Sequence, residues 1–192
     1  MCKKSLVLLT LFLAVPSLVL AQGVTTRSHP DFEGQTASPE DGGDTCPPGV
    51  MVAGPLPFVD SGDTCNGFTN TVSAYTAPCL TFSYQGEDTI YELTLAAGNN
   101  VSFSADLTGS TGDLAIFVIG TCGDGTSCVI SSQDAIGPGA GPELIAAQAY
   151  TPGTYFVYID SYYAAGQAGS CGTYELTVDG SLPAQLMGFS ID

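Results

Sequence analysis

Alternating apolar and polar residues run through the second half of the chain and predict short β-strands. Residues 89–95 read TIYELTL, in which every second side chain is apolar. A period of two is typical of a strand with one buried face. Residues 101–105 alternate in the same way, and the Gly- and Asn-containing stretch 97–100 predicts a turn between them. Together these segments predict a β-hairpin over residues 89–105.

Further strand patterns follow at regular spacing. The apolar run 114–119 predicts a central strand that is covered on both faces, and residues 143–150 predict another short strand. Alternation returns in residues 155–159 and 174–178, whereas the polar stretch 131–142 predicts a surface loop. The chain shows no convincing amphipathic helix. We therefore expect an all-β protein, a single-domain antiparallel β-sandwich of jelly-roll type.

The N-terminus has the pattern of a secretory signal. Lys3 and Lys4 precede an apolar run that ends near Ala21, and this run is shorter than a membrane-spanning helix needs. We expect residues 1–21 to be a signal peptide that is removed, so that the protein is secreted or held at a bacterial cell surface, without membrane insertion.

Composition divides the remaining chain into three parts. Residues 22–44 are polar and predict a flexible leader, residues 45–180 predict the β-sandwich, and residues 181–192 form an apolar C-terminal tail. The tail is predicted either to pack on the edge of its own domain or to add as a strand to another copy.

The charge of the chain argues against polyanionic partners. There are 19 Asp and Glu residues against three Lys and Arg, a formal net charge of −16. After removal of residues 1–21, Arg27 is the one remaining Lys or Arg. Such a protein repels nucleic acid and anionic membranes, and it attracts cations such as Ca²⁺.

Six cysteines remain after signal removal, which predicts three disulfides in an exported protein. Six cysteines allow fifteen connectivities. The short Gly-rich spacing favours Cys122 with Cys128, and we favour Cys65 with Cys79 and Cys46 with Cys171 for the other two bonds.

Several segments resemble, in order, the bacterial pre-peptidase C-terminal domain family. They read GEDTIYELTLAAGNNVSFSA, TGDLAIFVIG, GPELIAAQAYTPGTYFVYIDSYY and CGTYELTV, within residues 86–179. Residues 46–85 are similar to the cysteine-bearing extension of disulfide-containing members. The resemblance implies a small secreted β-sandwich that acts without catalysis in targeting, substrate contact or Ca²⁺-aided stability. This chain carries no hydrolase beside it, which puts a protease-accessory role in doubt.

The residue inventory also argues against catalysis. His29 is the single histidine and lies in the predicted leader, and Lys is absent after residue 4. The predicted domain therefore lacks the histidine that activates a catalytic nucleophile, the lysine that forms a Schiff base and the histidines of a His-rich zinc site. A carboxylate glycoside hydrolase is the third-ranked function, and the absence of Trp speaks against it.

Two groups of residues are candidates for binding. Asp113, Asp134 and Asp160 lie at strand ends or in loops and could supply oxygen ligands to Ca²⁺, although Asp also favours turns for its own backbone hydrogen bonds. Tyr162 and Tyr163 are adjacent on a Gly- and Ala-rich loop and could contact a ligand. The alternative is that one tyrosine anchors this loop and the other covers the core.

These observations favour a secreted, non-catalytic module that binds extracellular proteins or polysaccharides. The alternative is a structural subunit that self-associates into a filament or surface layer through strand edges and the tail.

Overall fold

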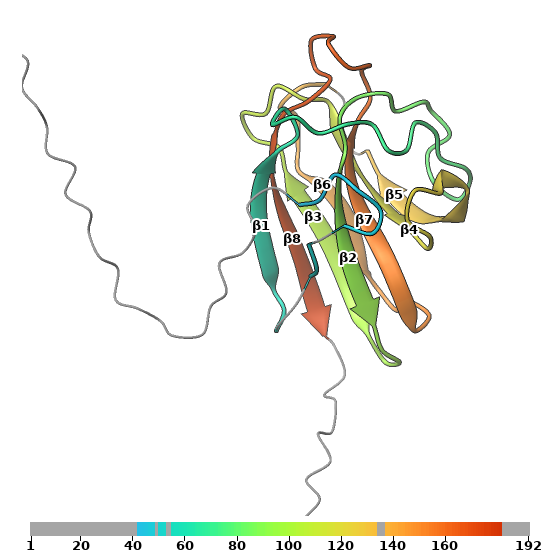
Figure 1. Ribbon diagram of the computed structural model, residues 1–192. Helices are drawn as coiled ribbons and strands as arrows, with labels where there is room; N and C mark the ends of the chain where they lie inside the picture. Colours follow the sequence, from blue (N-terminus) through green and yellow to red (C-terminus); the bar gives the residue numbers. More distant parts are fainter. Residues whose placement is uncertain (1–41, 49, 53–54, 134–136, 182–192) are drawn as a thin grey trace, which may run out of the picture. The chain divides into compact units, whose positions relative to one another are not determined.

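Eight β-strands and one short 3₁₀ helix make up the domain (Figure 1). The computed structural model describes residues 42–48, 50–52, 55–133 and 137–181. The predicted signal peptide, most of the leader, Asp134 and the tail from residue 182 lie outside these residues. The elements are β1 (Phe58–Asp63), β2 (Thr89–Leu95), β3 (Asn100–Asp106), β4 (Leu114–Ile119), η1 (Gly125–Ser127), β5 (Cys128–Ser132), β6 (Glu143–Gln148), β7 (Gly153–Ser161) and β8 (Thr173–Ser181).

The strands form two antiparallel sheets of four strands each. One sheet has the order β1-β8-β3-β6 and the other the order β2-β7-β4-β5. Strands β1 and β8, β2 and β7, β3 and β6, and β4 and β5 are hydrogen-bonded neighbours, as in a jelly roll. The prediction of an all-β sandwich is confirmed. Within the described residues, no helix is long and apolar enough to cross a membrane.

The main core lies between the two sheets and consists of the apolar faces that alternation predicted. Leu93, Phe103, Val157 and Leu176 each come from a different strand and are at most 1% exposed. Every side chain of β4 is buried, which confirms the prediction of a central strand covered on both faces. Gly98 adopts the positive φ of 80° that the turn after β2 requires.

The predicted hairpin over residues 89–105 is wrong. Strand β2 pairs with β7, whereas β3 pairs with β6 and β8 in the other sheet. The connection therefore crosses between the sheets, and Asn99 fixes it, because its side chain donates to the carbonyls of Ala96 and Tyr150 at 2.7 and 2.9 Å. Two strands that face each other across a core show the same alternation as two hairpin strands, so the pattern alone could not separate them.

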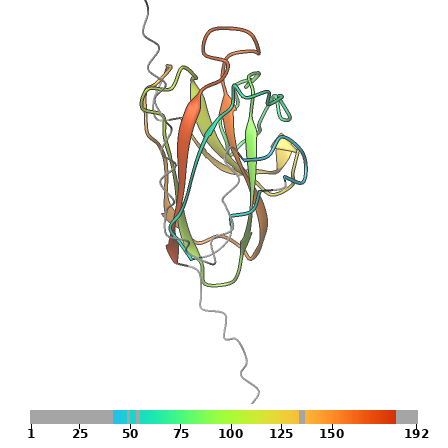
Figure 2. The ribbon, with the colours of Figure 1, turned by 60° about the vertical axis from the view of Figure 1, so that its left-hand side comes forward.

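A third layer covers the outer face of the β2-β7-β4-β5 sheet. It is the covering segment, residues 64–88, which connects β1 to β2 and contains no named strand. Its side chains form a second apolar cluster with the sheet, and Tyr75 stacks on Phe117 at a centroid distance of 3.6 Å. Figure 2 shows this segment running beside the sandwich. The members of the second cluster are Val72, Tyr75, Cys79, Tyr84, Ile90, Ala115, Phe117, Ile119, Cys128 and Tyr158.

The free edge of β2 is also covered. Gly43 exchanges two backbone hydrogen bonds with Ile90, both of 2.9 Å, and Glu92 bonds in turn to Val50 and Val52. An uncovered strand edge would expose unpaired N–H and C=O groups to other chains. Gly43, Val50 and Val52 therefore protect this edge of the sheet.

The three expected disulfides form, but none of the three favoured pairings is correct. The bonds join a cysteine that precedes β2 with one that follows β4 in every case. They are Cys46–Cys122, Cys65–Cys171 and Cys79–Cys128.

The strand register explains the observed pairings. Asp63 of β1 is the partner of Thr173 of β8, so Cys65 and Cys171, each two residues beyond that pair, lie side by side. Between Cys122 and Cys128, the Asp124 side chain accepts a 2.9 Å hydrogen bond from the Thr126 amide and caps η1. This compact turn sends the two cysteines to different partners, and spacing along the chain was therefore the wrong criterion.

Candidate functional site

The loop between β7 and β8, residues 162–172, projects from one end of the sandwich (Figure 1). It contains both tyrosines that the sequence singled out. Gly and Ala make up much of this loop, and Gly166 and Gly169 adopt positive φ values of 80° and 93°. These conformations favour glycine, and they turn the chain back toward β8.

Backbone hydrogen bonds hold the loop on two sides. On one side, Ala165 donates to Gln85 and Glu87 donates to Ser170, both at 3.1 Å, and these bonds tie the loop to the covering segment. On the other side, Tyr162 donates to the carbonyl of Asp113, just before β4, at 3.0 Å. The loop is therefore anchored by the domain despite its small residues.

Tyr162 and Tyr163 both remain partly exposed, at 41% and 37%. Their rings lie at a centroid distance of 5.3 Å with an interplanar angle of 83°. Tyr162 also makes an edge contact with Tyr84, which is fully buried, at 5.8 Å. Two accessible rings therefore form a corner at the surface, which we call the tyrosine corner, and Tyr84 supports it from below. Ligand binding at this corner stays a prediction.

Two of the three candidate calcium residues lie below the corner. Asp113 and Asp160 are 4% and 0% exposed and come from the neighbouring strand ends of β4 and β7. One carboxylate oxygen of Asp113 accepts a 3.0 Å hydrogen bond from the Gly137 amide. Asp134 lies outside the described residues. Among the residues that the structure describes, no three acidic, His or Cys side chains are placed to hold a metal ion.

Asp160 also interacts with the covering segment. The Tyr75 hydroxyl donates to Oδ2 of Asp160 at 2.7 Å, while Oδ1 has no hydrogen-bond partner within the described part of the chain. Burial, followed by the nearby charge of Asp88, raises the pKa of Asp160 well above its usual value. The hydroxyl of Tyr84 is likewise buried without a partner in the described structure.

Asp88 is a second buried acid that the sequence did not single out. Its carboxylate accepts hydrogen bonds from the Thr71 and Val72 amides at 2.8 and 3.0 Å and from the Thr71 hydroxyl at 2.8 Å. Burial outweighs these bonds and raises the pKa of Asp88 from 3.8 to about 6. No local signal could have found Asp88, because its partners lie in a segment without periodicity.

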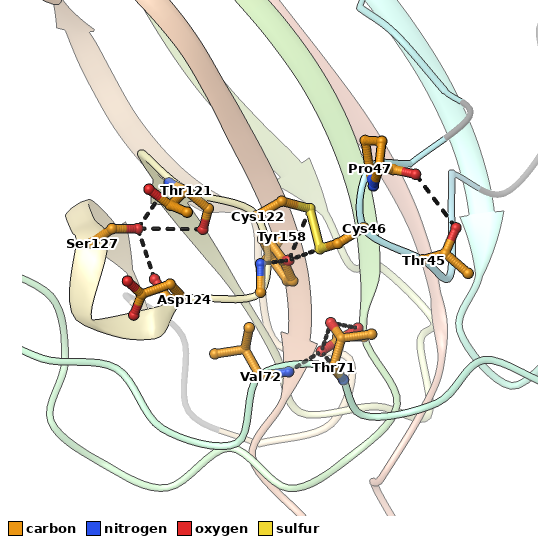
Figure 3. The surroundings of a disulfide bond; sticks show 12 residues. Thr45, Cys46, Pro47, Thr71, Val72, Thr121, Cys122, Asp124, Ser127 and Tyr158 are labelled. Carbon is orange, nitrogen blue, oxygen red and sulfur yellow. Dashed lines mark hydrogen bonds between the residues drawn. A yellow bond between two sulfur atoms is a disulfide. The ribbon is translucent and has the colours of Figure 1, made fainter.

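The Cys46–Cys122 disulfide lies against the side chain of Tyr158 in β7 (Figure 3). The Tyr158 hydroxyl accepts a 3.0 Å hydrogen bond from the Gly123 amide and lies 3.3 Å from Sγ of Cys46 and 3.6 Å from Sγ of Cys122. Cys46 is exposed, whereas both cysteines of the Cys79–Cys128 bond are buried. The disulfides thus differ in their access to reductants.

A shallow depression of about 260 Å³ opens on the other sheet. Asp106 of β3 and Glu175 of β8 are direct cross-strand neighbours there, and both are exposed. Hydrogen bonds from the Thr108 hydroxyl and amide lower the pKa of Asp106. The lining residues are Asp106, Thr108, Thr173, Tyr174 and Glu175.

Similarity to known proteins is found among solved structures. No protein-family model matches the sequence. No curated protein matches it either. Among solved structures, the chain is similar to the pre-peptidase C-terminal domain of a collagenase from Bacillus anthracis, with 18% sequence identity and a TM-score of 0.45, over 73% of this chain and 97% of that chain.

Proposed function

We propose that this protein is an exported, non-catalytic binding module whose contact surface is the tyrosine corner. The observation that carries the proposal is the pair of half-exposed rings on a loop that backbone hydrogen bonds hold in place. Aromatic side chains on an ordered loop supply contact area at low entropic cost, because little freedom is lost on binding. The three disulfides support export to an oxidising compartment.

The state of the carboxylates supports a non-catalytic role. A general acid needs a raised pKa and access to substrate. Asp88 and Asp160 have raised pKa values but are 0% exposed. Asp106 is accessible in the depression, but its pKa is lowered. These three carboxyl groups each lack one of the two requirements.

Binding assays with variants of the corner test the proposal. The mature protein is tested for co-sedimentation with insoluble cellulose and chitin, and for binding to one basic and one acidic immobilised protein. We expect at least one of these probes to bind, and the double variant Tyr162→Ala, Tyr163→Ala to lose most of that binding. Phe82→Ala, which removes a 56% exposed ring from the covering segment, should bind like wild type. Equal binding by all variants would contradict the proposal.

Calcium binding by Asp113, Asp134 and Asp160 is a separate prediction. An ion that binds only the native state raises the melting temperature, and the increase grows with the logarithm of the ion concentration once that concentration exceeds Kd. If these residues bind Ca²⁺, millimolar CaCl₂ should raise the melting temperature of wild type more than that of Asp134→Asn. An identical melting temperature with CaCl₂ and with EDTA would contradict calcium binding by the folded protein.

A further inference from the structure

The arrangement of the two rings at the tyrosine corner limits what can bind there. Tyr162 and Tyr163 are nearly perpendicular, with an interplanar angle of 83°. A sugar ring stacks on a flat aromatic face, and two perpendicular rings do not form one continuous flat surface. A cationic side chain can instead bind to a single exposed ring face, because the face of an aromatic ring is electronegative.

The charges below the corner also favour a cation. Tyr84, which contacts Tyr162, lies in the field of Asp160, Asp113 and Glu143, and these carboxyl groups raise the pKa of its hydroxyl after the larger effect of burial. All three carboxyl groups are at most 4% exposed. The sequence contains no Lys, Arg or His after residue 29, so no cationic side chain of the described domain balances them.

Two buried polar atoms below the corner have no hydrogen-bond partner in the described structure. They are Oδ1 of Asp160 and the hydroxyl oxygen of Tyr84, and both residues are 0% exposed. Buried polar atoms normally have partners, and low-dielectric surroundings screen their fields weakly. Asp160 and Tyr84 therefore place two uncompensated oxygen atoms beneath the corner.

We propose that the tyrosine corner binds an arginine or lysine side chain of a basic extracellular protein. This inference rests on the proposed function and selects a protein partner over a neutral polysaccharide. A guanidinium group stacks on aromatic faces and is weakly hydrated, so arginine fits the corner better than lysine does. The anionic surface of the whole domain would draw such a partner in, and the rings would fix where it docks.

The test uses the full mature chain and a fluorescein-labelled peptide, Gly-Arg-Gly-Arg-Gly-Arg-Gly, in an anisotropy titration. A second peptide carries citrulline in place of arginine, which keeps the shape and removes the charge. We expect the arginine peptide to bind and the citrulline peptide to bind at least tenfold more weakly. Tyr162→Leu should weaken binding of the arginine peptide about tenfold, and Tyr162→Phe, which keeps the ring, should not.

These variants do not change the net charge, so they separate the corner from general attraction to an acidic surface. Phe82→Leu is the matched control and should bind like wild type.

If Tyr162→Leu, Tyr163→Leu and wild type bind the arginine peptide equally, surface charge alone is responsible and the inference is overturned. If the tyrosine variants lose chitin or cellulose binding but not peptide binding, the inference fails while the proposed function stands. If the tyrosine variants bind the arginine peptide, chitin and cellulose as wild type does, both the inference and the proposed function fail. Melting curves of each variant establish that it is folded.

Discussion

Two buried aspartates hold the covering segment in place, Asp88 within the segment and Asp160 from strand β7 beneath it. Asp88 binds the backbone of Thr71 and Val72, and Asp160 binds the hydroxyl of Tyr75. Burying a carboxylate is unfavourable unless it is hydrogen-bonded or protonated, and no basic side chain is present in the described domain to pair with either one. The stability of this layer should therefore depend on pH.

The direction of that dependence follows from the raised pKa of Asp88. The folded protein binds this proton more tightly than the unfolded chain does, since the pKa rises from 3.8 to about 6. The stabilising contribution is complete below about pH 4 and is lost as the pH rises through about 6, a change of about 3 kcal/mol.

Asp88→Asn should remove this contribution, because an amide can accept from the two backbone amides and donate to the Thr71 hydroxyl without carrying charge. Urea unfolding at pH 4 and pH 7 gives the free energies of unfolding. Wild type should lose about 2 kcal/mol more than Asp88→Asn between these pH values, because at pH 4 part of the unfolded chain is already ionised at this residue. The exposed substitution Asp179→Asn serves as the control and should behave like wild type. Parallel pH profiles for wild type and Asp88→Asn would show that the pKa of Asp88 is not raised by folding.

At the residue scale, the sequence identified several of the buried positions but not their partners. Asp113 and Asp160 were recognised as acids at strand ends and assigned to calcium. In the structure, Asp160 accepts a hydrogen bond from the hydroxyl of Tyr75, 85 positions away in sequence, while its role in calcium binding stays a prediction. A partner at such a distance leaves no trace in local spacing. The tyrosine pair could be singled out because both residues lie beside a recognisable strand, and its role in binding stays a prediction.

At the scale of elements, the covering segment and the β7–β8 loop stabilise each other. Gly86 lies where they meet, and a Cβ atom at this position would collide with the backbone oxygens of Ser170 and Tyr163 and with the Ser161 side chain. Glycine is therefore required for this close approach rather than for an unusual φ.

Gly86→Ala should push the loop away from the covering segment. We expect a loss of about 1–3 kcal/mol in the free energy of unfolding, typical of overpacking at a buried contact. Hydrogen exchange should also accelerate at the amides of Glu87 and Ala165, which bridge the two segments. Gly153→Ala is a matched control, because a Cβ atom there meets nothing within 4 Å. If both variants are equally stable and equally protected, the close contact at Gly86 does not exist.

Regular strands were predictable, and irregular ones were not. Strands β2, β3, β4, β6, β7 and β8 correspond to segments with alternation or a continuous apolar run. Strands β1 and β5 were missed, because their sequences FVDSGD and CVISS are rich in Ser, Gly and Asp. Tertiary pairing decides their structure: β1 lies beside β8, and β5 lies beside β4. The covering segment was missed as a layer for the same reason.

At the scale of the whole molecule, the disulfides connect distant parts of the chain and limit how far it can extend. The Cys65–Cys171 bond closes a loop with a sequence separation of 106. The covalent path from Cys46 to Ser181 therefore needs 29 residues instead of 135. When stretched, these paths would measure about 100 Å and about 470 Å.

Pulling on the termini of single molecules should measure this shorter covalent path. In the oxidised protein, the stretch between Cys46 and Ser181 should extend to about 100 Å, and in the reduced protein to about 470 Å. Replacing Cys65 and Cys171 by Ser should give about 200 Å, because the path then runs through the Cys46–Cys122 bond. Replacing Cys79 and Cys128 should leave the length at about 100 Å, which makes this pair the control. An equal lengthening in both double variants would contradict the connectivity.

Three disulfides join the part of the chain before β2 to the part after β4, and this connectivity is the central structural claim. Peptide mapping of the non-reduced protein measures this pairing, with pepsin as the protease, since the sequence offers trypsin no cleavage site after Arg27. We predict linked peptides that contain Cys46 with Cys122, Cys65 with Cys171 and Cys79 with Cys128. Peptides that link Cys122 with Cys128, or Cys65 with Cys79, would contradict the account.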